Sequence, residues 1–231
     1  MAEEKTLKQS NLTYLRGFII LNIMIFLFMA KIDISGMVGF LDFDIKSNKI
    51  FNKLAEDAIV APLILALFYI LVTLLSGLID STTKERLVFL RWNDVLPGCR
   101  AFSKHMYEDP RIDPEIIEKN NGVLPTESSK QNSLWYRIYK KYQNEQPILD
   151  AHRNFLLMRD LCGIHLICSI GLGATGYFVI ENKNHYAIYL SVMVAILALL
   201  IFAARNYGVR FVTNVLALET CSKKESIAVT P

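Results

Sequence analysis

The chain has 231 residues and a net charge of +3, and its composition is 52% hydrophobic and 20% charged. This charge is too small to indicate a nucleic-acid-binding protein by itself. The apolar residues are gathered in blocks, which is typical of a membrane protein and argues against a soluble globular domain. The cysteines show no CxxC pair, so we expect reduced, structural cysteines rather than disulfides or a zinc site.

Residues 1–80 predict a first membrane hairpin. The apolar run after Arg16, extended by the preceding turn, gives a span at about residues 12–31. A secretory signal peptide is an alternative for the amino-terminal polar segment and the apolar run after it, although no clean cleavage pattern follows them. Residues 58–79 form the clearest span, because no charged residue interrupts them and Pro62 lies in the tolerant first turns.

The loop between these spans, residues 32–57, is expected outside the cytoplasm, either structured or lying in the membrane interface. Glu56 and Asp57 stand at the outer mouth of the second span. They would form an acidic ring in an oligomeric channel. The simpler interpretation is a solvated pair at a helix entry.

Residues 81–159 form a polar insert with several turn signals. Pro114 predicts the first residue of a short helix over residues 114–120, which Asn120, Asn121 and Gly122 then break. Ser133 predicts the cap of the next helix, which places its aromatic residues on one face. An insert of this size needs a small hydrophobic core, and we expect both Trp92 and Trp135 to belong to it.

Residues 160–221 predict a second hairpin with spans at about 161–180 and 187–204 and an amphipathic helical extension. The helix that begins at Pro147 is expected to continue unbroken to Ile180, so the insert and the third span share it. The last residues, 222–231, are expected to be disordered. Small residues in the third span suit close helix packing and predict a homo-oligomer; they are Ser169, Gly171, Gly173 and Gly176.

Basic residues flank the insert and occur near both chain ends. By the positive-inside rule, they predict that both termini and the insert are cytoplasmic. The lysines of the loop 32–57 disagree, but they lie mid-loop and are balanced by acidic residues.

Few residues carry a chemical signature. Arg100 and His105 have the Arg-x4-His spacing that resembles the motif of HEPN-type ribonucleases, except that Ala101 stands where that motif usually has a polar residue. His165, near the start of the third span, is either a functional intramembrane histidine or a hydrogen-bonded packing residue. Because no phosphate-binding, metal-binding or nucleophile motif occurs, we predict a non-enzymatic protein without cofactor or metal.

Basic side chains interleave with the aromatic residues of the insert and are the predicted contacts for a soluble cytoplasmic protein partner or a ligand. They are Arg91, Arg100, His105, Arg137, Lys140, Lys141 and Arg153.

Together these features predict an all-α membrane protein with four transmembrane helices and a cytoplasmic helical domain inserted between spans two and three. In span count, size and placement of the insert, this layout is similar to small four-span membrane components of bacterial antiphage defence systems. That resemblance implies a protein that senses a ligand or damage and acts at the inner membrane. A channel or transporter subunit is the alternative. Against it, the first, second and fourth spans have almost no polar residues to line a path, with Asn22 in the first span as the exception. A membrane-bound nuclease acting through Arg100 and His105 is a further alternative.

Overall fold

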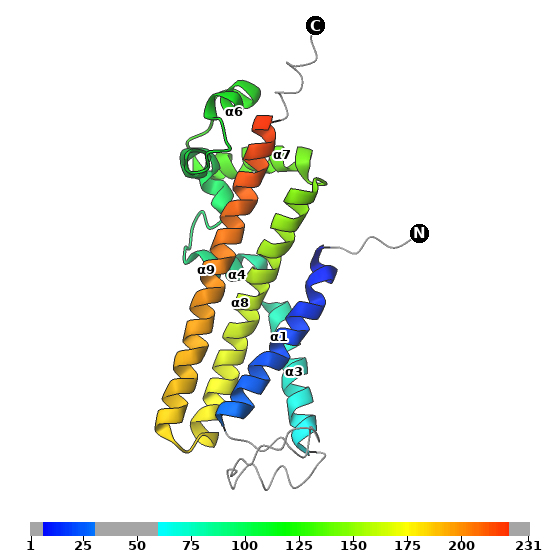
Figure 1. The fold of residues 1–231 in the computed structure, drawn as a ribbon, viewed down its shortest axis with the longest axis vertical. Coiled ribbons are helices and arrows are strands. Elements are labelled where there is room, and N and C mark those ends of the chain that lie inside the picture. Colours follow the sequence, from blue (N-terminus) through cyan, green and yellow to red (C-terminus); the bar gives the residue numbers. More distant parts are fainter. Residues whose placement is uncertain (1–6, 31–59, 222–231) are drawn as a thin grey trace, which may run out of the picture. The chain divides into compact units, whose positions relative to one another are not determined.

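The computed structural model describes residues 7–30 and 60–221, and these residues are helical without a β-strand (Figure 1). The predicted loop 32–57, its acidic pair Glu56 and Asp57, and the predicted tail 222–231 lie outside the described residues. The all-α fold predicted from the sequence is confirmed for the described part of the chain.

Three helices are long and apolar enough to cross a membrane: α1 (Leu7–Met29), α8 (Gln146–Val179) and α9 (Lys183–Cys221). Helix α3 (Val60–Leu78) meets the same criterion only together with α4 (Ser81–Phe89), across a sharp bend. The described residues therefore contain three candidate spans, or four if this pair forms one. Helices of this length and composition are typical of a membrane protein.

The two longest helices exceed what a bilayer requires. Helix α8 has 34 residues and α9 has 39. At about 1.5 Å per residue they are about 50 and 60 Å long, whereas the hydrocarbon core is about 30 Å thick. The predicted continuous helix from Pro147 to Ile180 is confirmed to within one residue at each end. The helical extension of the last span to Cys221 is confirmed as well.

The described residues divide into two compact units. We call residues 7–10, 81–159 and 201–221 the insert unit, and residues 11–30, 60–80 and 160–200 the span unit. Helices α8 and α9 each supply residues to both units, because each is one continuous helix. The insert thus forms one unit with the carboxyl-terminal part of α9, which was predicted from the sequence to belong to the second hairpin.

The insert unit contains η1 (Pro97–Arg100), the π-helix η2 (Ala101–His105), α5 (Met106–Glu108), α6 (Pro114–Asn121) and α7 (Ser128–Tyr142). Its core joins these helices to α8 and α9 through buried side chains that include Phe102, Met106, Ile117, Ile138, Ile148, Val215 and Leu216.

The start of α6 agrees with the sequence. Pro114 is in its first turn, and the Asp113 carboxylate accepts a hydrogen bond from the Glu115 amide at 3.0 Å. The helix ends at Asn121, and the following Gly122 has a φ of 76°, a left-handed conformation that glycine adopts without strain. The predicted cap of α7 is wrong, because Ser133 lies inside that helix and donates to the Ser129 carbonyl at 2.9 Å.

The two tryptophans have different surroundings. Trp135 is 7% exposed and belongs to the core of the insert unit, as expected. Trp92 is 78% exposed, so its predicted place in the core is wrong. It lies in the segment after α4 with the guanidinium of Arg86 over its ring, at 5.5 Å from the ring centroid.

The span unit has a core built from α1, α3, α8 and α9, with Phe26, Val72, Cys168 and Tyr189 among its buried side chains. Large apolar side chains also stand on its surface, Phe28 and Phe178 among them, with about three quarters of each exposed (71% and 77%). Apolar residues on the outside are expected where lipid rather than water surrounds a helix.

Candidate ligand pocket

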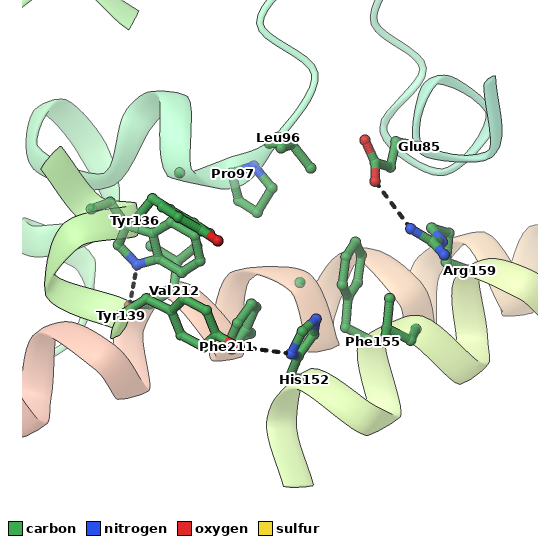
Figure 2. A pocket seen from close by; sticks show the side chains of 14 residues that line it. Glu85, Leu96, Pro97, Tyr136, Tyr139, His152, Phe155, Arg159, Phe211 and Val212 are labelled. Atoms are coloured by element: carbon green, nitrogen blue, oxygen red, sulfur yellow. Dashed lines mark hydrogen bonds and ion pairs between the residues drawn. The ribbon is translucent and has the colours of Figure 1, made fainter. Parts of the chain in front are cut away.

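A pocket of about 190 Å³ lies within the insert unit (Figure 2). Five elements converge on it: α4, η1, α7, α8 and α9. The residues that line it are Glu85, Leu96, Pro97, Gly98, Trp135, Tyr136, Tyr139, His152, Phe155, Leu156, Arg159, Gly208, Phe211 and Val212.

Two glycines allow these elements to approach each other. A Cβ atom on Gly208 would lie 2.8 Å from the ring of Phe89 and 3.1 Å from the ring of Phe155. A Cβ atom on Gly98 would lie 3.1 Å from the Trp135 ring and would clash with the side-chain oxygen of Asn132. Any larger residue at either position would displace the aromatic side chains that shape this region.

The wall formed by α7, α8 and α9 is a set of packed rings. The imidazole of His152 stacks on Phe211 with centroids 4.7 Å apart and planes inclined by 5°. Tyr139 and Trp135 meet the same phenyl ring edge-on, at 5.3 and 5.2 Å. Such ring pairs contribute stability beyond their buried area and hold each ring in one orientation.

Three polar side-chain atoms of this wall have partners within it. His152 Nδ1 lies 3.3 Å from the Tyr139 hydroxyl, and Trp135 Nε1 donates to the Val212 carbonyl at 3.4 Å. Trp135 and Tyr139 can therefore offer ring surface to a ligand while their own donors stay hydrogen-bonded.

One edge of the pocket carries charge. Arg159 Nη1 donates to Glu85 Oε1 at 3.1 Å, and the two side chains are only 10% and 15% exposed. Figure 2 shows this ion pair and Tyr136 at opposite ends of the pocket, with Pro97 between them. A ligand in the pocket would meet aromatic and aliphatic groups along its length and this ion pair at one end.

The size of the pocket limits the ligand. An apolar cavity of roughly 150 Å³ is large enough to take up benzene, whereas pockets for drug-sized molecules begin at about 300 Å³. The pocket therefore suits a molecule of about one ring with a short substituent. A flat and mostly apolar molecule with one polar group matches the walls best.

None of the basic residues predicted to contact a partner lines this pocket. Lys140 holds its ammonium group over the rings of Tyr136 and Tyr139, at 5.4 and 5.8 Å. Lys141 is paired with the buried carboxylate of Glu219 at 3.1 Å. The remaining members have separate local surroundings: Arg153 lies 3.4 Å from Asp150, and Arg91 and Arg137 are exposed. That these residues receive a soluble partner stays a prediction.

The Arg-x4-His pair has a defined geometry. Arg100 donates to the Asp94 carbonyl at 3.1 Å. His105 is buried in η2, with its Nδ1 3.1 Å from Glu108 Oε2, and burial lowers its pKa against the opposing effect of Glu108. The two residues thus contact different groups. Gln131 fixes the π-helix, because its side-chain oxygen accepts from the amides of Phe102 and Ser103, both at 3.1 Å.

The small residues of α8 are packing residues within the span unit. A Cβ atom on Gly171 would contact Phe68 at 3.2 Å, one on Gly173 would contact Leu190 at 3.6 Å, and one on Gly176 would contact Tyr186 at 3.3 Å. The Ser169 hydroxyl donates within the helix to the His165 carbonyl at 2.7 Å. These glycines permit close helix approach inside one chain, and their use between chains stays a prediction.

The two polar residues singled out in the spans are partners of each other. His165 is fully buried, and its Nδ1 lies 2.8 Å from Asn22 Oδ1. Its Nε2 lies 2.8 Å from the Met193 carbonyl, and the Asn22 amide donates to the Phe18 carbonyl at 2.8 Å. This network ties α1, α8 and α9 together and favours the packing interpretation of His165.

Most residues that line the pocket were not predicted from the sequence. His152, Phe155, Leu156 and Arg159 have the i, i+3, i+4, i+7 spacing of one helix face, and this pattern was available in the sequence. The approach of Gly208 and Phe211 from the distant α9 left no local signal. Among the described residues, no group of three or more His, Cys, Asp or Glu side chains is arranged to hold a metal ion. No family model, curated protein or solved structure matches this chain.

Proposed function

We propose that this chain is a non-enzymatic, multi-pass membrane protein whose insert unit binds a small, mostly apolar ligand and reports its presence to the membrane helices. In this proposal the protein has four spans, resides in a bacterial inner membrane as a homo-oligomer, and keeps the insert and both termini in the cytoplasm. A role in antiviral defence agrees with its layout.

The pocket carries this proposal. Its walls include four residues of α8 and three of α9, and these are His152, Phe155, Leu156, Arg159, Gly208, Phe211 and Val212. The same two helices continue into the candidate spans. A ligand in contact with His152 and Phe211 would therefore act directly on two helices that supply candidate spans.

Binding is tested with three one-ring probes of different charge: benzyl alcohol, benzoate and benzylamine. In a Trp92→Phe background, Trp135 is the single tryptophan and reports occupancy through its emission. The expected result is saturable quenching by at least one probe together with a higher unfolding temperature in detergent. The charge of the best probe shows whether Arg159 or Glu85 meets the polar group.

Two neighbouring substitutions separate the pocket from unspecific partitioning. Leu156→Phe places a phenyl ring in the pocket, in place of the smaller leucine side chain, and is expected to abolish saturable binding. Leu157→Phe adds the same ring one residue away, on a side chain that does not line the pocket, and is expected to leave binding intact. Equal binding by the two variants would refute the pocket. Absence of saturable binding in the parent and in both variants would refute it as well.

Topology is tested separately by labelling from outside the cell. Cys99, Cys162 and Cys168 are buried and Cys221 is exposed, so a Cys221→Ser background removes the accessible thiol. Cysteines are then placed at the exposed positions Asn184 and Ser129. Labelling only of the cysteine at position 184 supports a cytoplasmic insert. Labelling only of the cysteine at position 129 indicates the opposite orientation.

A further inference from the structure

The segment that follows α4 presents apolar and basic side chains to the outside. Leu90 and Trp92 are 67% and 78% exposed, and Arg86 and Arg91 are exposed beside them. The Arg86 guanidinium covers the Trp92 ring at 5.5 Å. Neither of the large apolar side chains is part of the core of the insert unit.

The backbone holds this segment in an unusual conformation. Leu90 and Asp94 have φ values of 50° and 48°, in the left-handed region that residues with a Cβ atom rarely adopt. Each such residue is less stable in this conformation than in an ordinary one and persists only where its surroundings hold it. Hydrogen bonds fix both ends, because the Leu90 amide donates to the Arg86 carbonyl at 2.8 Å and Arg100 donates to the Asp94 carbonyl at 3.1 Å. Leu90 and Trp92 are thus exposed by a defined turn.

We propose that residues 90–94 anchor the insert unit to the membrane surface, with Leu90 and Trp92 at headgroup depth and Arg86 and Arg91 on lipid phosphates. Tryptophan is favoured at this depth because its ring is apolar and its N–H can bond to water or headgroups. Arginine side chains near anionic headgroups add favourable charge interactions.

The position of the segment in the chain favours lipid as its partner. The apolar helix α3 ends at Leu78, and α4 accounts for nine of the residues between that end and Trp92. A helix of this length advances only about 13 Å, which keeps Trp92 on a short tether. The anchor rests on the membrane assignment of the apolar helices and is independent of the ligand pocket.

The chain offers a direct test, because Trp92 and Trp135 are its only two tryptophans. The Trp135→Phe protein is reconstituted into vesicles of phosphatidylcholine with a minor fraction of phosphatidylglycerol. The phospholipids carry bromine either near the glycerol or near the methyl end of the acyl chains. We expect Trp92 emission to be quenched more by the shallow bromine than by the deep bromine and to be protected from aqueous iodide.

The Trp92→Phe protein is the matched control, since its remaining Trp135 is buried and should respond to neither reagent. If Trp135→Phe fails to fold, the wild-type signal minus that of Trp92→Phe gives the same measurement. Replacing Arg86 and Arg91 by glutamine should reduce the shallow quenching only when phosphatidylglycerol is present. Quenching by iodide without quenching by bromine places Trp92 in water and overturns the anchor. Protection from both reagents indicates a protein partner and overturns it as well.

Discussion

The buried carboxylate of Glu219 offers the sharpest test of how the insert unit is held together. Its side chain is 3% exposed and accepts from Lys141 Nζ at 3.1 and 3.4 Å, from the Tyr142 hydroxyl at 2.8 Å and from Asn121 Nδ2 at 3.2 Å. These bonds join α6 and α7 to the last turn of α9. Lys141→Met removes the cationic partner and leaves a buried charge with neutral donors.

The cost follows from this geometry. Removing one member of a buried ion pair costs about 3–5 kcal/mol, and a hydrogen bond to a charged group contributes about 1.5–3 kcal/mol. Lys141 is 53% exposed, so water already screens part of its interaction. We therefore expect Lys141→Met to lower the local free energy of opening by about 2 kcal/mol, which corresponds to roughly thirtyfold faster amide exchange.

Hydrogen exchange measured by mass spectrometry on the full chain in nanodiscs reports this change in peptides from α6 and α7. Lys140→Met is the control, because Lys140 is the adjacent exposed residue and its hydrogen bond to Gln143 is exposed. We expect it to alter exchange by no more than about 0.5 kcal/mol. Adding Glu219→Leu to Lys141→Met should recover part of the loss. Equal exchange in the two lysine variants would show that the Glu219 carboxylate is solvated.

Three further predictions concern packing, pH and the span unit. Gly208→Ala should destabilise the chain by about 1–3 kcal/mol in thermal unfolding, because its Cβ would meet aromatic rings. Gly17→Ala, with nothing within 4 Å, should be neutral or stabilising. Hydrogen bonds from Arg111 lower the pKa of Asp109 to about 2, so its stabilising contribution is present above about pH 4 and is lost as pH falls toward 2. Asp109→Asn should remove that part of the pH dependence of the unfolding temperature. His165→Leu should lower the free energy of unfolding by about 2 kcal/mol. Replacing its partner Asn22 as well should lower it by less than the sum of the two single losses.

The helices were predictable where the signal is local. The stem from Pro147 to Ile180 follows from continuous helical residues after a proline at a helix start, and α6 follows from Asp113, Pro114 and Gly122. The start of α7 was missed because no side chain caps it, and the residue before it, Glu127, makes no cap hydrogen bond. Ser133 had the right residue type in the wrong place, since a serine inside a helix can bond to its own preceding turn.

The pocket was not predictable for a different reason. Its aromatic wall pairs His152 with Phe211, which are distant in the chain, and nothing local in the sequence of α9 indicates that pairing. The basic residues were predicted as contacts for a partner because charge is visible in a sequence. In the structure, Lys141 is paired with the buried carboxylate of Glu219. Trp92 shows the same limit, because a tryptophan in a polar segment gives the same local pattern in the sequence whether its side chain is buried or exposed.

The size of the insert explains why α9 matters to the pocket. A segment of about 80 residues buries too small a fraction of its surface to be strongly stable alone. In this chain the missing apolar surface comes from α9, whose Phe211, Val212, Val215 and Leu216 are buried in the core of the insert unit. The pocket borders that shared core, so a ligand in it adds contacts to helices that also supply candidate spans. A ligand can shift a conformational equilibrium only by the difference between its affinities for the two states. A ring-sized apolar molecule that binds only when His152 and Phe211 are correctly spaced has such a difference, and it would act on α8 and α9 without any additional linker.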